Sequence, residues 1–351
     1  MKRLFSAAAL VLASFPLQSQ ETPRFEEQID VNVVLVDATV TDRRGRHILG
    51  LAKDDFIIKE DGVVQEIASV DYFTNRRLLD SPEEKAKFKV ERVRQERYFI
   101  FFFDRFLDLS ERSAYQADLM QARRAAKDLV QRDLLPEDRV AVAGFDARLK
   151  IFTDFTGDKK TILAALDEVL SFGQGLREPA ASSSAESILG NIDLKEMMDR
   201  TGTQYDALRV LADAVRPIQA RKVVMLFSPG VWDVDRLQSQ FIAPEHHRYE
   251  PMLHALNRAN VSVYAINPMR DTQIRAGEDT LTRTTTETGG EYFRQSVSFL
   301  VPLRKIENEN NGYYLLTYHA KKPKGATGYQ KIDVALRNPE FRLKAREGYA
   351  Y

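Results

Sequence analysis

The chain has 351 residues, of which 44% are hydrophobic and 29% charged, a balance typical of a globular protein with room for about two domains. Its 51 basic and 51 acidic residues leave a net charge of zero, so no overall positive field favours nucleic acid or an acidic membrane as a partner. The absence of cysteine excludes disulfides, thiolate metal sites and thiol nucleophiles.

The N-terminus has the pattern of a signal peptide. Lys2 and Arg3 precede an uncharged, largely apolar run over residues 4–17, which is too short to span a bilayer as a helix. We therefore assign residues 1–20 to a signal peptide and expect cleavage near Ser19, with a position after Ala13 as the alternative, since no clear A-x-A site fixes it. An exported chain without cysteine favours a secreted or periplasmic bacterial protein. No later segment is long and apolar enough to predict a membrane span.

Residues 21–78 are predicted to form strands. The stretch 29–40 is rich in β-branched residues, and strands are also expected at 56–58 and 63–67. Between them, Asp61-Gly62 is typical of a hairpin turn because glycine accepts a positive φ. This part is interpreted as one half of a small β-sandwich. The highly charged residues 79–97 that follow are predicted to be a linker.

The pattern then changes to alternating strands and helices, which assigns residues 98–310 to an α/β domain. Continuous apolar runs predict buried strands, and a 3.6-residue period predicts helices between them. The predicted strands are 98–103, 139–145, 222–227 and 261–266, with an edge strand at 149–152. The predicted helices start near Ser110, follow a cap at Asp158, run through 208–218, and occupy 299–306. The polar stretch 177–202 is predicted to be a surface loop. Such alternation indicates a mostly parallel sheet with helices on both faces.

Residues 311–351 return to a β pattern. Strands are expected at 313–319 and 329–336, with a third at 341–344, and Tyr349 and Tyr351 are candidates to dock the tail. Since both ends of the chain are β-rich, we predict that they form one β-sandwich together.

An ordered series of segments resembles a von Willebrand factor A domain. Residues 139–145 resemble its second strand, residues 202–208 its threonine loop and following helix, and residues 221–230 the strand that leads to its last metal loop. The flanking residues 37–42, 51–56 and 346–349 are similar to the VWFA-related family of secreted bacterial proteins, known chiefly from acidobacteria. The resemblance implies a Rossmann-like A domain that binds partners at the carboxyl edge of its sheet.

In that family, partners bind through a metal-ion-dependent adhesion site with an Asp-x-Ser-x-Ser loop, a threonine and a further aspartate. Asp104 matches the first aspartate and Thr203 the threonine. Phe106 stands at the first serine position and cannot coordinate a metal, while Asp108 stands at the second and could. Pro229 replaces the last aspartate. The adhesion site is therefore predicted to be degenerate.

Two interpretations of these residues follow. In one, Asp104, Asp108 and Thr203 hold Mg²⁺, which needs few protein ligands. In the other, no cofactor is expected: Asp104 is a hydrogen-bond acceptor at the strand end, Asp108 caps the next helix, and Arg105 fills the metal position with its own charge.

Other candidate chemistry is weaker. His247, Glu250 and His254 share a face if their segment is helical, which could bind Zn²⁺, but Pro251 interrupts that pattern and favours a solvated loop. No Gly-x-Ser-x-Gly elbow surrounds Ser228, so serine hydrolysis is not expected. Trp232 follows the last metal loop and is either a contact for a partner or packed beneath that loop.

We therefore expect a binding module and not an enzyme, with an unknown protein as partner and Arg105, Phe106, Trp232 and Asp233 as candidate contacts. One alternative is a cell-envelope hydrolase that uses the carboxylates of Asp104, Asp108 and Asp233, which would require raised pKa values and a cleft. The other alternative is a structural component of the envelope.

Overall fold

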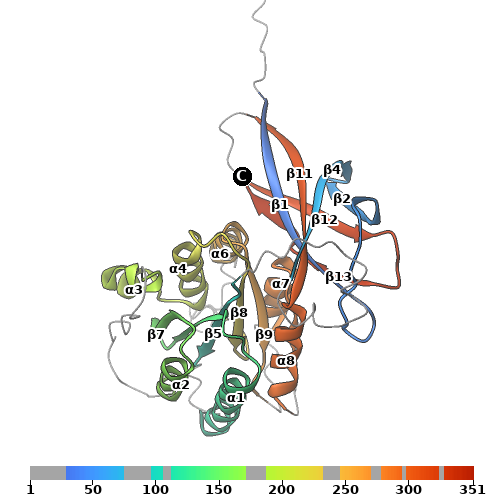
Figure 1. Cartoon of the computed structure of the whole chain (residues 1–351). Coiled ribbons are helices and arrows are strands. Elements are labelled where there is room, and N and C mark those ends of the chain that lie inside the picture. The colour runs from blue at the N-terminus through green and yellow to red at the C-terminus, as the bar shows by residue number, and fades with distance from the viewer. Residues whose placement is uncertain are drawn as a thin grey trace, which may run out of the picture.

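A computed structural model of the chain describes residues 29–74, 96–105, 112–170, 187–231, 246–269, 278–294, 298–323 and 328–351. A six-stranded α/β unit forms one end of the molecule, and two small antiparallel sheets form the other (Figure 1). This arrangement confirms the predicted fold class, including a β-sandwich built from both chain ends. The predicted signal peptide at residues 1–20 and most of the predicted linker lie outside the described residues.

The central sheet has the strand order β10-β9-β8-β5-β6-β7, and only β7 runs antiparallel to its neighbour. Its strands are β5 (Tyr98–Asp104), β6 (Arg139–Phe145), β7 (Leu149–Thr156), β8 (Lys222–Phe227), β9 (Val261–Ile266) and β10 (Tyr292–Phe293). The strand predictions at 139–145, 222–227 and 261–266 are confirmed residue for residue. Continuous apolar runs identified them because both faces of these strands are covered.

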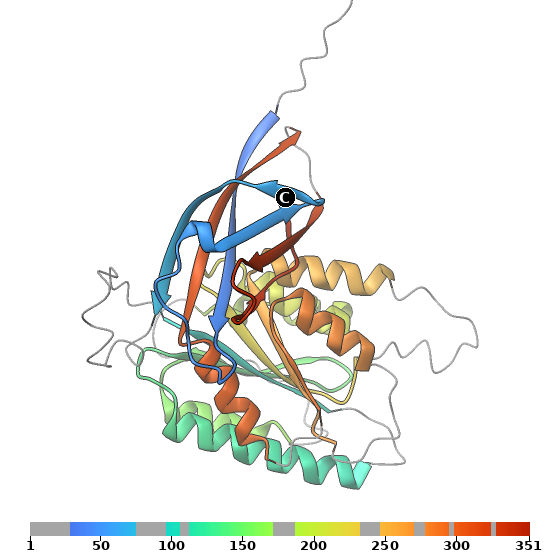
Figure 2. The same cartoon turned by 90° about the vertical axis from the view of Figure 1, so that its right-hand side faces the viewer.

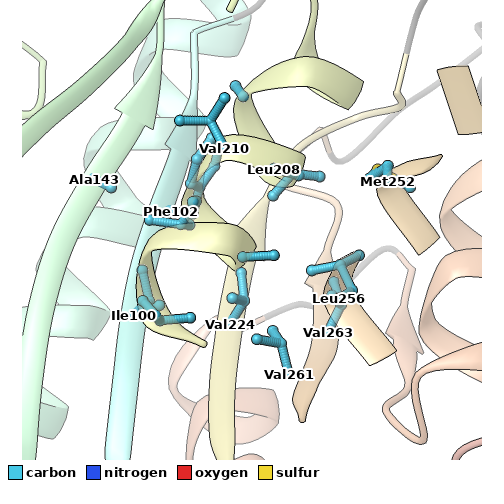
Figure 3. Packing of buried hydrophobic residues seen from close by; sticks show 14 of the residues in the cluster. Ile100, Phe102, Ala143, Leu208, Val210, Val224, Met252, Leu256, Val261 and Val263 are labelled. Atoms are coloured by element: carbon cyan, nitrogen blue, oxygen red, sulfur yellow. The ribbon is translucent and has the colours of Figure 1, made fainter. Parts of the chain in front are cut away.

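Side chains of β5 alternate between two helical layers. Phe99, Phe101 and Phe103 pack toward α1 (Arg112–Arg132), α2 (Lys159–Glu168) and α8 (Leu300–Glu309). Ile100 and Phe102 pack on the other face (Figure 3). The helices there are α3 (Leu194–Arg200), α4 (Gln204–Val215), α6 (His246–Arg258) and α7 (Glu278–Glu287). Asp158 caps α2, as predicted, and accepts hydrogen bonds from the backbone of Lys160 and Thr161.

The β-sandwich consists of two four-stranded sheets in the orders β13-β1-β11-β4 and β14-β12-β2-β3. The strands of the first are β1 (Ile29–Thr41), β4 (Ile67–Thr74), β11 (Gly312–Pro323) and β13 (Arg342–Ala345). Those of the second are β2 (Phe56–Glu60), β3 (Val63–Gln65), β12 (Tyr329–Leu336) and β14 (Gly348–Ala350). Alternate residues of β1 and β11 form their shared core with Phe56, Ile58 and Tyr349. Tyr349 is 5% exposed, as expected for a docked tail.

Three local predictions are wrong. The predicted strand 63–67 is split after Gln65, because β4 leaves for the other sheet. The described part of the predicted loop 177–202 contains the short helix η3 (Leu189–Asn191) and α3, both held by buried apolar residues. The predicted solvated loop around Pro251 is the helix α6. Tyr249, Met252, Leu253 and Leu256 bury one face of α6, and this burial outweighs the one backbone donor that proline removes.

The sandwich contacts the α/β unit at the end of the central sheet where β8 begins. Arg221 donates a 3.0 Å hydrogen bond to Thr39 Oγ1 of β1, and Asn260 donates a 2.7 Å hydrogen bond to Asp37 Oδ2. Arg346, which directly follows β13, donates to the carbonyls of Asn257 and Leu35. The opposite end of the central sheet, where β5 and β8 terminate, is therefore clear of the sandwich (Figures 1 and 2). No helix in the described ranges is long and apolar enough to cross a membrane.

Candidate functional site

Asp104 ends β5 at the carboxyl edge of the central sheet. The neighbouring parallel strand β8 ends one position earlier in register, at Phe227, and is followed by Ser228. Helix α4 begins at the same edge, directly after Thr203. In open α/β sheets this edge is where ligands bind. Residues far apart in the sequence are thus brought together at the predicted position of the site.

The Asp104 side chain is held by two neutral donors. Ser228 Oγ lies 2.6 Å from Asp104 Oδ2 and donates to it, and Gln204 Nε2 donates to the same oxygen. The second oxygen, Oδ1, is buried and has no hydrogen-bond partner among the described residues. Asp104 is 1% exposed, and this burial raises its pKa to about 7, against the lowering effect of the two hydrogen bonds.

A proton on Asp104 would rearrange this small network. Ser228 Oγ also lies 2.7 Å from the carbonyl of Gly230, and one hydroxyl hydrogen can serve only one of the two acceptors at a time. When Asp104 is protonated, its carboxyl can donate to Ser228, which then donates to Gly230. The backbone of Asp104 is fixed independently, because Tyr115 Oη of α1 donates to its carbonyl. The network therefore joins β5, β8, α1 and α4.

Arg105 lies beside Asp104 and is 3% exposed. Its Nη1 lies 2.8 Å from Asp146 Oδ2 at the end of β6, and Lys150 Nζ lies 3.1 Å from the same carboxylate oxygen. The Arg105 amide also donates to the carbonyl of Phe145. Arg105 is thus buried at this edge, and its charge is paired with Asp146, the residue that follows β6.

Thr203 is the N-cap of α4, and its hydroxyl is used within that cap. Thr203 Oγ1 accepts from the Asp206 amide at 3.2 Å and lies 2.8 Å from Asp206 Oδ2. Arg248 of α6 pairs with Asp206 at 2.9 Å. Thr203 is thus placed next to Gln204, the donor to Asp104, while its own contacts stabilise the start of α4.

The segment that leads to Thr203 is anchored by one buried carboxylate. Asp154 Oδ2 of β7 accepts hydrogen bonds from Ser187 Oγ and from the amides of Ile188 and Leu189, at 2.7–3.0 Å. Further along, Thr201 Oγ1 accepts from the Leu149 amide at the start of β7. These contacts fix the position from which α4 starts.

The described residues do not fit a Mg²⁺ site. Within the described ranges, no group of three or more His, Asp or Glu side chains is placed to hold a metal ion. Asp104 contributes one carboxylate whose Oδ2 accepts an amide N–H, and the Thr203 hydroxyl is engaged with Asp206. Mg²⁺ requires oxygen ligands in near-octahedral geometry, which this set does not provide.

Four of the predicted site residues, Phe106, Asp108, Trp232 and Asp233, lie outside the described residues. His254 of α6 stacks on Tyr329 of β12 with ring centroids 4.4 Å apart and lies 3.5 Å from Glu250. It is thus part of the contact between α6 and the sandwich.

Four residues of this site were not predicted from the sequence: Gln204, Ser228, Tyr115 and Asp146. Ser228 and Asp146 could have been predicted from their position, because each directly follows a buried strand, β8 or β6, that flanks β5. Gln204 follows Thr203 directly. Tyr115 could be found only from the fold, because its hydroxyl reaches the end of β5 from one face of α1.

No protein-family model matches the sequence, and no curated protein does either. Among solved structures, the chain is similar to the human COPII-coat protein Sec24c, with a TM-score of 0.39 and 12% identity over 72% of this chain and 43% of that one. It is also similar to the PilB minor pilin from Streptococcus sanguinis, with a TM-score of 0.39 and 12% identity over 64% of each chain. BatB from Bacteroides thetaiotaomicron gives a TM-score of 0.36 and 14% identity over 61% of this chain and 96% of that one. These likenesses concern the arrangement of the backbone, and the VWFA-related family stays a prediction from the sequence.

Proposed function

We propose that the chain is a secreted or periplasmic protein-interaction module that binds a protein partner at the carboxyl edge of its central sheet, without a metal ion. The observation that carries this proposal is the buried network in which Gln204 and Ser228 donate to Asp104. It ties the ends of β5 and β8 to the start of α4, so the described part of this edge has a fixed arrangement. Preorganised surfaces of this kind favour binding because little conformational freedom is lost on association.

The surroundings of the network support the same role. Ion pairs fix the neighbouring turns, between Arg105 and Asp146 on one side and between Arg248 and Asp206 on the other. At the tip of the β6–β7 hairpin, Ala147 has a φ of 58° and Arg148 is exposed. A positive φ at a residue other than glycine costs energy, and its presence at an exposed tip favours a functional reason for the conformation.

One observation favours the rival hydrolase. The pKa of Asp104 is raised to about 7, as a general acid or base would require. However, Asp104 is 1% exposed, and the two donors to its Oδ2 are a serine hydroxyl and an amide. A carboxyl group in this position reaches no substrate without a rearrangement of the edge, so we prefer the binding role.

The role of metal is tested by calorimetric titration of the purified chain with Mg²⁺ and Mn²⁺, beside Asp104→Ala. The proposal expects no saturable binding in either protein. Saturable binding that is lost in Asp104→Ala would restore a metal-dependent adhesion site and contradict the metal-free mechanism.

The binding face is tested by site-specific photo-crosslinking in cells that naturally produce the chain. A photoreactive residue replaces Arg148 at the carboxyl edge or, as a matched control, Arg132, the last residue of α1, which precedes the start of β6; both arginines are exposed. We expect a discrete crosslinked protein from position 148 and none from position 132. Equal products from both positions, or none from position 148, would contradict the proposed face.

A further inference from the structure

One edge of strand β1 is only partly paired with a neighbouring strand. On one side β11 pairs with residues 29–38 of β1, but on the other side β13 pairs only with residues 38–41. Among the described strands, none pairs with residues 29–37 on the β13 side. Arg346, which follows β13, donates to the carbonyl of Leu35, and that oxygen keeps a second lone pair for another donor.

The side chains along this edge are apolar and exposed. Val33 is 60% exposed and Leu35 46%, whereas the alternate residues Val34 and Val36 lie in the sandwich core. This end of β1 extends with β11 away from the central sheet as an arm in both views (Figures 1 and 2). No other part of the described chain therefore buries the side chains of Val33 and Leu35.

The edge also lacks the features that normally prevent strands from pairing between molecules. The segment 31–36 contains no charged residue and no proline, and the pairing of β1 with β11 has no bulge. A six-residue, β-branched and uncharged segment with an open edge promotes uncontrolled association when it is left uncovered. Pairing of this edge with one specific strand would prevent that uncontrolled association.

We propose that β1 pairs antiparallel with β1 of a second copy of this chain, across a two-fold axis centred on Val33. The Leu35 carbonyl faces the open side, since it accepts from the residue that follows β13. In a strand, alternate residues direct their backbone groups to the same side, so the N–H and C=O of Val33 face that side as well. Two copies can therefore exchange both hydrogen bonds between their Val33 residues.

The sequence around Val33 is compatible with this symmetry. In the two-fold register, position 31 lies opposite 35, position 32 opposite 34, and Val33 opposite itself. Within this stretch, every facing pair except Asn32–Val34 joins two apolar residues. In the same register Asp30 falls opposite position 36 and Asp37 opposite position 29, so the register pairs no two acidic residues. A closed two-fold dimer uses both open edges and leaves none for further growth.

The test is the oligomeric state of the purified chain by sedimentation velocity over a range of concentrations. Val33→Lys places a charge on the proposed interface at an exposed position, and Val301→Lys on α8 is the matched control, since Val301 is 68% exposed. We expect concentration-dependent dimers, a dissociation constant at least tenfold higher for Val33→Lys, and no change for Val301→Lys. Circular dichroism of both variants checks that each is folded.

Because the chain has no cysteine, single-cysteine variants give a second measurement of the same contact. A spin label on Val33→Cys should show dipolar broadening at dimer concentrations, whereas one on Val301→Cys should not. A chain that is monomeric at every concentration overturns the proposal, and so does a dimer that Val33→Lys does not weaken. A dimer weakened by Val301→Lys places the interface on α8 and overturns it too. These outcomes do not depend on the proposed binding face at the carboxyl edge.

Discussion

A carboxyl group that is 1% exposed and faces only two neutral donors is costly to ionise, and Asp104 is such a group. In an adhesion site a metal ion would compensate for that cost. Here the described residues around Asp104 supply neutral hydrogen bonds, while the nearby cation of Arg105 pairs with Asp146. The structure thus favours a protonated Asp104 over part of the physiological pH range, since its pKa is about 7.

The first prediction concerns the pH dependence of stability that Asp104 causes. Its pKa is about 7 in the folded chain and near the ordinary value of 3.8 when unfolded, so the folded state binds the proton more tightly. Stability should therefore fall as the pH rises from about 4 to 7, and the full cost is present above pH 7. Asp104→Asn removes the charge. Its stability relative to the native chain should rise by up to roughly 3 kcal/mol between pH 4.5 and pH 8.

Urea denaturation at the two pH values measures this difference. Asp71→Asn, at an exposed position on β4, is the control and should show little change between the two pH values. If the free energies of unfolding of Asp104→Asn and the native chain changed equally with pH, Asp104 would ionise in the folded chain without a loss of stability. Another group would then have to stabilise its buried charge.

At the scale of single elements, the buried strands were the most predictable part of the chain. Runs such as 222–227 are apolar on both faces and end at polar residues, so pattern alone placed them. Helix α7 escaped prediction because it is rich in threonine, which disfavours helices. In the fold, Thr284 and Thr288 donate to the carbonyls four residues earlier, and the buried Leu281 holds the helix against its layer.

The site was predictable only as far as its position in the topology. Asp104 and Thr203 were found from the resemblance, and the fold places them at one edge of the sheet. The partners of Asp104 could not be found in the same way. A glutamine at the start of a helix or a serine after a strand has no distinctive spacing, and the contact of Gln204 with Asp104 spans 100 residues.

The second prediction concerns the segment that positions α4. Asp154→Ala removes the acceptor that holds Ser187, Ile188 and Leu189 to β7 and leaves their donors unpaired. A loss of about 2–4 kcal/mol in the free energy of unfolding is expected, because each buried donor without a partner is costly. Asp199→Ala on the exposed face of α3 is the control. Faster hydrogen exchange at the amides of Ile188 and Leu189 would locate the effect, and unchanged exchange there would contradict it.

At the scale of the whole molecule, the sandwich and the α/β unit meet through a polar contact that is rich in positive charge. Arg221 and Lys222 are 7% and 1% exposed, and Arg346 lies beside them. Burial lowers the pKa of Lys222 to about 8 and also lowers that of Arg346, while the carboxylate of Asp37 acts in the opposite direction on both. Asp37 of β1 is thus a shared counter-ion for cations from β8 and from the segment after β13.

The third prediction is that Asp37 holds the two parts together. Asp37→Asn should lower the free energy of unfolding by about 1–3 kcal/mol, because the buried cations of Lys222 and Arg346 lose the nearby negative charge that favours their ionised forms. In a Lys222→Met background the same substitution should cost clearly less, since one of those cations is gone. Urea titrations of the four proteins give the coupling energy. Equal losses in both backgrounds would show that the contact of Asp37 with Asn260, and not its charge, is what the junction needs.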